Sequence, residues 1–219
     1  MLFRSNVTVP SDFHVIASGL QTARPGPEGL TVQSFKYERP SFPGSLAVVS
    51  AEPQRVTSAG SAITMYFHGA EREQASAYGE AAGQMVQYFT SIFGLPPSVN
   101  LTLVEAEDNA PNGYAAPGIL FLSPKGIGSR VNTRLLAQEI AHQWWRVLVS
   151  PTSRRHLWLD NGFSNYARML YTENTAGPSA LEADIQETAV EALTTNETTL
   201  LQSDTLPDYS PELDRKSVV

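Results

Sequence analysis

Two short segments of this sequence carry the residues that could do chemistry. Residues 138–145 read Gln-Glu-Ile-Ala-His-Gln-Trp-Trp, and residues 158–163 read Trp-Leu-Asp-Asn-Gly-Phe. Two His at positions i and i+4 of a helix share one face and can hold a Zn²⁺, and a Glu beside the first His then acts as general base. Here Gln138 stands at the first His position, whereas Glu139 and His142 have the required types.

The metal-ligand set that these residues offer is incomplete. A catalytic zinc site uses three protein ligands and keeps a fourth position for water. Gln138 supplies only a neutral amide oxygen, and Asn161, on the following predicted helix, is neutral as well. A single imidazole, that of His142, binds zinc with low affinity. We therefore expect no bound cofactor, unless His156 or Asp160 supplies a substitute ligand and restores zinc.

The spacing of these residues resembles that of the gluzincin aminopeptidases, the zinc metallopeptidases of the aminopeptidase N and leukotriene hydrolase type. Their pattern is His-Glu-x-x-His, eighteen residues, and then Glu within Trp-Leu-Asn-Glu-Gly-Phe. Eighteen residues also separate His142 from Asn161 here, and the flanking Ala-His-Gln-Trp-Trp and Gly-Phe agree. The resemblance implies that Glu139 holds the general-base position and His142 a surviving metal-ligand position. Gln138 and Asn161 then stand at two replaced ligand positions.

Two more elements of that family are replaced or missing. Residues 112–116 lie where the family has Gly-x-Met-Glu-Asn, whose Glu binds the free amino terminus of the substrate. Ala115 stands at the position of that Glu. The family's Tyr that stabilises the tetrahedral intermediate follows a Ser-Val lead, and this sequence stops at residues 217–219, about where that Tyr would follow. We expect a piece of a longer parent chain.

The resemblance implies an α+β, thermolysin-like zincin catalytic-domain fold, with a mixed sheet and motif helices preceded by a β-rich fragment. The replaced elements favour a pseudoenzyme, a metallopeptidase-like domain in which Glu139 is vestigial. Such a domain would bind a peptide or protein partner, or serve as a structural module. The alternative is an active zinc metallopeptidase, a hydrolase of peptides with non-standard ligands. In the geometry that the resemblance implies, the side chains of Gln138 and Asn161 point toward the same position. We therefore expect a direct or water-bridged contact between their amides.

Composition excludes several classes of protein. Of 219 residues, 42% are hydrophobic and 17% charged, as in ordinary globular proteins. No apolar run is long enough to span a membrane, and a net charge of −7 without a basic stripe argues against nucleic-acid binding. The absence of Cys excludes disulfides and thiolate zinc sites. The abundance of Ser and Thr leans weakly toward an extracytoplasmic or membrane-associated parent protein.

The chain divides into residues 1–45, expected to be the tail of an amino-terminal β-domain, and residues 46–219, expected to be a carboxy-terminally truncated peptidase domain. Alternation and turn residues predict the strands and turns. Strands are expected at residues 7–10, 13–17, 32–37, 46–50, 61–67, 99–105 and 118–122, with 46–50 in the sheet of the second domain, and turns at 24–29 and 40–44.

Apolar residues at 3.6-residue spacing predict four helices. They are expected at residues 71–93, at 132–147 with Asn132 as N-cap, around Asn161 to about residue 171, and at 179–202. In the last of these, Glu182, Asp184, Glu187 and Glu191 have helical spacing and are expected to form an exposed acidic face.

Overall fold

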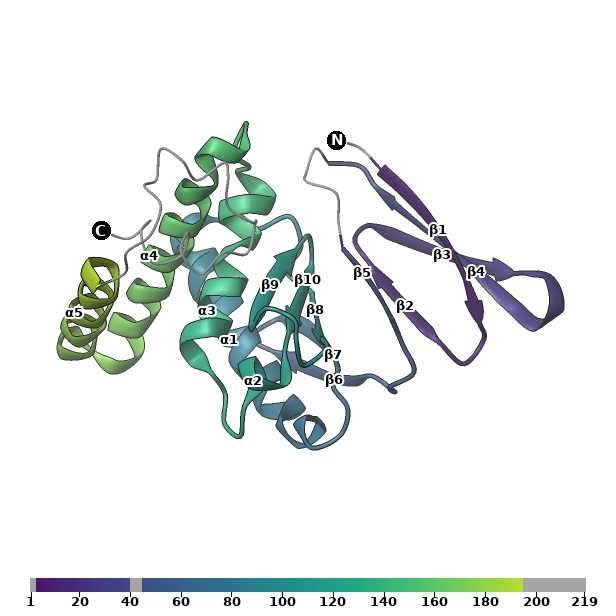
Figure 1. Ribbon diagram of the computed structural model, residues 1–219, viewed down its shortest axis with the longest axis horizontal. Helices are drawn as coiled ribbons and strands as arrows, with labels where there is room; N and C mark the ends of the chain where they lie inside the picture. The colour runs from purple at the N-terminus through teal and green to yellow at the C-terminus, as the bar shows by residue number, and fades with distance from the viewer. Residues whose placement is uncertain (1–2, 40–44, 195–219) are drawn as a thin grey trace.

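The computed structural model describes residues 3–39 and 45–194. Helices gather on one side of a five-stranded sheet, and the amino-terminal strands lie on the other side of it (Figure 1). The arrangement is the predicted α+β class with a β-rich amino-terminal region. No helix among the described residues is long and apolar enough to cross a membrane.

The amino-terminal strands form two small antiparallel sheets. A three-stranded sheet has the order β1-β4-β3, and a two-stranded sheet pairs β2 with β5. Their bounds are β1 Phe3–Pro10, β2 His14–Ala17, β3 Leu20–Pro25, β4 Leu30–Tyr37 and β5 Leu46–Val49, with a short 3-10 turn η1 at Pro27–Gly29. Val9, Val15 and Phe35 form their buried core.

In this region one strand was missed and one expectation was wrong. Strand β3 was not predicted, because all six of its residues are exposed and it therefore lacks the alternation that marks a strand. The predicted strand at 46–50 forms as β5 but pairs with β2, from His14↔Val49 to Ala17↔Leu46, and does not join the larger sheet. The expected turn at 40–44 lies outside the described residues.

The larger sheet is mixed, as predicted. Its order is β6-β7-β8-β10-β9, with parallel pairs β7–β8 and β8–β10 in the middle and antiparallel strands at both edges. The bounds are β6 Gln54–Ser58, β7 Ser61–Tyr66, β8 Leu101–Glu105, β9 Gly113–Ala116 and β10 Ile119–Leu122. The central strands were predicted, because their inward residues form a buried apolar pattern. The edge strands β6 and β9 were missed.

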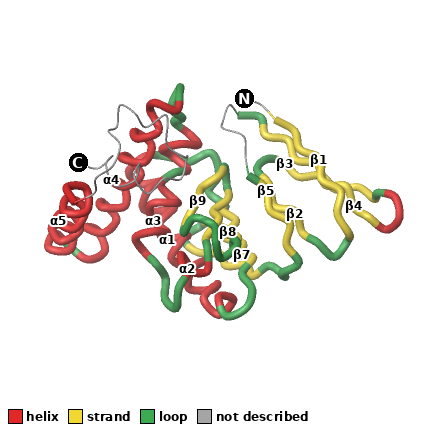
Figure 2. The backbone as a smooth tube through the Cα atoms, in the orientation of Figure 1, coloured by secondary structure: helices red, strands yellow, loops and turns green. Residues whose placement is uncertain are grey.

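Helix α1 (Ala75–Phe93), preceded by the 3-10 turn η2 (Glu71–Gln74), covers β6 and β7, and the other helices lie on the same face of the sheet (Figure 2). The approach of helix to sheet requires glycine: a Cβ at Gly83 would lie 2.5 Å from both the Cβ and the backbone oxygen of Ser58. Gly94, with φ of 80°, ends the helix at the predicted place.

The remaining helices are α2, α3, α4 and α5. Their bounds are Pro124–Ile127, Thr133–Ala141, Leu157–Ala176 and Pro178–Thr194, with a 3-10 turn η4 at Arg154–His156. Asn132 caps α3 as predicted, because its Oδ1 accepts a hydrogen bond of 3.2 Å from the Leu135 N–H. The expected end of the last helix, residues 195–202, lies outside the described residues.

The motif helix is shorter than the predicted 132–147. Regular helix ends at Ala141 and is followed by η3 (Gln143–Leu148), a wide turn in which Trp145 and Arg146 leave helical φ/ψ values. Two of its hydrogen bonds span five residues, from Val147 N–H to His142 O and from Val149 N–H to Trp144 O. Periodicity alone did not reveal this break, because Trp144 and Val147 are still buried at helix-like spacing.

Candidate functional site

The site predicted from the sequence lies where α3 packs against α4. Glu139 on α3, His142 just after it and Asn161 on α4 are all buried, with exposed fractions of 3% to 5%. The packing of these two helices therefore brings together His142 and Asn161, which have eighteen residues between them in the chain. Gln138 lies on the same helix but is only partly buried.

Both ring nitrogens of His142 face protein oxygen atoms. Nδ1 lies 3.4 Å from the Trp145 backbone oxygen, and Nε2 lies 3.4 Å from Ser164 Oγ. Burial lowers the pKa of His142 well below its ordinary value, the nearby Arg146 charge lowers it further, and the Trp145 carbonyl acts in the opposite direction. The imidazole is therefore neutral near pH 7, with Ser164 as its neighbour on α4.

A guanidinium group, which the sequence reasoning did not consider, occupies the junction of the two helices. Arg146 Nε donates to Asp160 Oδ2 at 2.9 Å, and Nη2 lies 3.3 Å from Asp160 Oδ1 and 3.2 Å from Asn161 Oδ1. Burial is the largest single influence and lowers the pKa of Arg146. The carboxylates of Asp160 and Glu139 outweigh it, so that the pKa is raised overall. Arg146 is thus a fixed positive charge.

The amide contact expected between Gln138 and Asn161 is not formed directly. Among the described residues, the Asn161 side chain accepts its hydrogen bond from Arg146. The tie between the two helices is therefore ionic and runs from the turn after α3 to the first turn of α4. Asp160 lies in that first turn, where the helix dipole favours a negative charge.

The general-base position is tightly packed against the edge strand β9. A Cβ at Gly113 would lie 2.7 Å from Glu139 Oε1, so a larger residue there would have to displace the Glu139 side chain. Ala115 on the same strand is 1% exposed and carries no charge with which to hold a substrate amine. Gln143 fixes the neighbouring backbone, because its side chain accepts from Gly118 N–H at 2.9 Å and donates to Ala116 O at 3.0 Å.

These residues do not fit a catalytic zinc ion. The Asn161 oxygen is engaged by a cation, and His142 Nε2 faces a hydroxyl instead of an open space between ligands. Asp160 is paired with Arg146, and His156 is exposed and lines a cleft beside the junction. Within residues 3–39 and 45–194, no three His, Cys, Asp or Glu side chains are arranged to hold a metal.

An apolar cleft of about 330 Å³ opens beside the helix junction. The Trp145 and Phe163 rings stack within it, with centroids 4.9 Å apart. Leu159 and Phe163 are 36% and 47% exposed, although both are apolar. The cleft is lined by Trp145, Val149, Ser150, Pro151, Thr152, His156, Leu159, Asp160 and Phe163.

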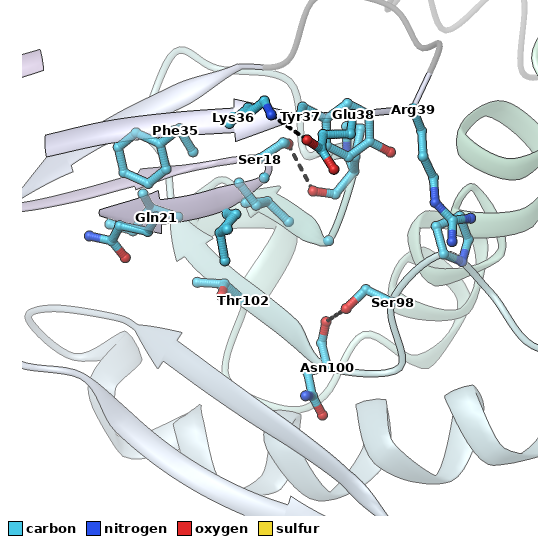
Figure 3. A pocket seen from close by; sticks show the side chains of 18 of the residues that line it. Ser18, Gln21, Phe35, Lys36, Tyr37, Glu38, Arg39, Ser98, Asn100 and Thr102 are labelled. Carbon is cyan, nitrogen blue, oxygen red and sulfur yellow. Dashed lines mark hydrogen bonds and ion pairs between the residues drawn. The ribbon is translucent and has the colours of Figure 1, made fainter. Parts of the chain in front are cut away.

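A second hollow, of about 500 Å³, lies between the amino-terminal strands and the five-stranded sheet (Figure 3). The Ser18 hydroxyl donates to Pro117 O at 2.8 Å across it, and Lys36 pairs with Glu38 at its rim at 2.5 Å. None of the site residues predicted from the sequence lines this hollow. The sequence-predicted chemistry therefore belongs to the α3–α4 junction alone.

The sequence reasoning overlooked Arg146, Ser164 and Gln143 as parts of the site. A helical signal existed for two of them. Arg146 follows His142 by four residues, and Ser164 follows Asn161 by three, so each lies near the motif face. The signal for Arg146 was misleading, because the helix does not continue to that residue.

A mixed sheet covered by helices, with candidate site residues where two helices meet, is the arrangement of a zincin-type metallopeptidase. Residues 125–213 match the Peptidase family M1 domain. The M1 zinc metallopeptidase from Deinococcus radiodurans superposes with a TM-score of 0.68 at 20% identity, covering 92% of this chain and 47% of that one. A mutant of it bound to a Tyr-Ser-Ala substrate gives a TM-score of 0.73 at 18% identity, covering 99% and 50%.

Two curated aminopeptidases are also similar to this chain. Endoplasmic reticulum aminopeptidase 2 of Homo sapiens is 26% identical over 130 residues, which are 54% of this chain and 14% of that protein. Leucine aminopeptidase 2 of Eremothecium gossypii is 26% identical over 166 residues, which are 73% of this chain and 26% of that protein. These similarities agree with the resemblance to the gluzincin aminopeptidases that the motif spacing predicts. The chain spans at most about a quarter of these two curated relatives.

Proposed function

We propose that this metallopeptidase-like domain binds a peptide or a protein segment without hydrolysing it. Hydrolysis in this fold class needs a metal-bound water and a carboxylate that deprotonates it. Glu139 is still present here, but the residues around it do not fit the metal. Without an activated water, Glu139 is a buried carboxylate beside Arg146 and has no proton to remove from a nucleophile.

The observation that carries the loss of hydrolysis is the hydrogen bond between Arg146 and Asn161. It joins a cation to the residue at the third ligand position, at 3.2 Å. A metal ion and a guanidinium cannot both use this oxygen in the same direction. The contact therefore supports a site whose polar groups are hydrogen-bonded to other protein groups and not to a metal ion.

The apolar cleft supports the binding half of the proposal. Ligand sites are concave and mostly apolar with a few polar groups, and this cleft combines the stacked Trp145–Phe163 pair with His156 and Asp160 at its edge. The fold shapes the cleft, so it does not depend on a metal. Because a solved relative holds a Tyr-Ser-Ala substrate, short peptides with an aromatic residue are the first ligands to test.

The test combines cleavage and binding on one protein sample. A panel of short peptides, including Tyr-Ser-Ala, is incubated with and without zinc and chelator, and the products are separated by mass. We expect no chelator-sensitive cleavage. Such cleavage would establish the alternative, a zinc peptidase with non-standard ligands, and would defeat the proposal.

Binding of the same peptides is followed by chemical-shift changes or calorimetry. We expect Phe163→Ala to weaken binding several-fold, because it removes one wall of the cleft. Tyr166→Ala is the matched control, since Tyr166 is an exposed aromatic residue on the same helix that lines a different hollow. If no peptide is bound and none is cleaved, the proposal that the domain binds peptides is wrong, and a purely structural role is the remaining explanation.

A further inference from the structure

We propose that Arg146 is a built-in cation that takes the place of a metal ion at the α3–α4 junction. The inference rests on the proposed loss of the metal and adds a cause that acts within this chain. In this reading, the replaced ligands Gln138 and Asn161 are only part of the change. The other part is a guanidinium that fills the electrostatic role of the metal and prevents its return.

The contacts of Arg146 match those expected of a substitute cation. Its guanidinium reaches both oxygens of Asp160 and the oxygen of Asn161, at 2.9 to 3.3 Å. The planar fork of arginine suits such two-point binding of a carboxylate. Its side chain is 12% exposed and that of Asp160 is 2% exposed, so the pair is almost enclosed.

The charges around Arg146 point to the same role. Glu139, at the general-base position, acts on the guanidinium as a second negative charge. A metal ion would otherwise be the largest local positive charge in such a site. With Arg146 in place, the negative charges of Glu139 and Asp160 already have a positive neighbour, and a divalent ion would be repelled.

The backbone turn after α3 brings the Arg146 side chain to the α3–α4 junction. A continued helix would carry residue 146 one turn beyond His142 along the helix axis. In the structure the helix stops at Ala141, and the turn that follows returns the Arg146 side chain to α4. Ser150 Oγ donates a short hydrogen bond to the Arg146 backbone oxygen and holds the far side of the turn.

The inference makes a prediction about recovery of the metal site. The two replaced ligands are restored with Gln138→His and Asn161→Glu, first alone and then together with Arg146→Ala. Each protein is incubated with zinc, freed of excess metal, and assayed for zinc content and for the zinc-induced shift in its urea unfolding midpoint. Arg130→Ala, added to the same two changes, is the control, because it removes the same charge from an exposed residue.

We expect the variant with Arg146→Ala to hold about one zinc per chain and to bind it about 10–100-fold more tightly than the other two, the range seen for residues beside metal ligands. Equal zinc affinity with and without Arg146 would overturn the inference. Failure of the Arg146→Ala variant to bind zinc while it keeps a cooperative unfolding transition would also overturn it.

A second comparison does not depend on the redesigned site. Arg146→Lys keeps the charge but loses the fork, whereas Arg146→Met loses both. We expect the unfolding midpoint to fall in the order wild type, Lys variant, Met variant, and equal midpoints would refute the role. Stoichiometric zinc in the wild-type protein with chelator-sensitive cleavage would instead defeat the proposed function, so the two failures are distinguishable.

Discussion

Two buried arginine–carboxylate clusters hold helix α4, and they are built differently. At the start of the helix, Arg146 binds Asp160 and reaches Asn161. In the middle of the helix, Arg168 binds Asp184 of α5 in a short contact. The side chains of both carboxylates are at most 5% exposed, so each carboxylate depends on its partner for stabilisation in a low-dielectric setting.

The second cluster follows from regular helix geometry. Arg168 Nε donates to Asn165 Oδ1 at 3.0 Å, three residues earlier on α4. Asp184 has a second guanidinium as well, because Arg134 Nη2 lies 2.6 Å from its Oδ1. Three helices, α3, α4 and α5, are therefore joined at one carboxylate. Asp184 was expected on an exposed acidic face and is instead 6% exposed.

The first cluster lies at a break in a helix. Its arginine lies in the non-helical turn η3, and its carboxylate lies next to a replaced ligand position. The guanidinium of Arg146 contacts both a carboxylate and an amide. The middle cluster therefore joins regular helices through two arginines, whereas the junction cluster also holds an irregular turn. We expect the junction cluster to be the more sensitive of the two.

Among single substitutions, the largest effect is expected for Arg146→Met. The change removes the guanidinium from a carboxylate that is 2% exposed, and breaking a buried pair costs about 3–5 kcal/mol. The free energy of unfolding in urea measures it. The Asp160→Asn variant and the double variant complete a cycle, in which the double change should cost less than the sum of the single changes. Strict additivity would show that the pair is not coupled.

A smaller loss, about 1.5–3 kcal/mol, is expected for Arg168→Met, the typical value of hydrogen bonds to charged groups. Asp184 keeps Arg134 when Arg168 is removed, so its charge still has a partner. Urea unfolding under the same conditions makes the two arginines directly comparable. A loss for Arg168→Met that exceeds that for Arg146→Met would reverse the comparison between the clusters.

The redundancy itself is open to test. Arg134→Met combined with Arg168→Met removes both guanidiniums from Asp184. We expect the double variant to lose more stability than the sum of the two single losses, because only then is the carboxylate left without a guanidinium. A simple sum would mean that the two arginines act independently on α5.

The fold and the position of the site were predictable for different reasons. The central strands and α1 have the periodic apolar residues that report burial, and eighteen residues between His142 and Asn161 identified the helix pair. Local pattern could not give β3, whose residues are all exposed, or the partner of β5, which depends on distant pairing with β2.

The chemistry of the site was only partly predictable. The replaced residues Gln138 and Asn161 could be read directly from the sequence, but the reason that their amides form no direct hydrogen bond could not. It depends on a helix that stops at Ala141 and on the path of the turn that carries Arg146. Asp184 was misassigned for a related reason: helical spacing shows which acidic residues share a face, but not which arginine on another helix covers that face.

The smallest effect is expected where the middle cluster reaches solvent. Arg134 Nη1 also binds Glu187 Oε2 at 2.6 Å, but these two side chains are 46% and 56% exposed. Exposed pairs contribute about 0–1 kcal/mol and weaken with salt, so Glu187→Gln should lower the free energy of unfolding within that range. Urea unfolding at low and high salt checks it, with Glu182→Gln on the same helix as control. Arg134 contacts both a buried and an exposed carboxylate. If Glu187→Gln lowers the free energy of unfolding as much as Arg168→Met does, burial does not determine the strength of these ion pairs.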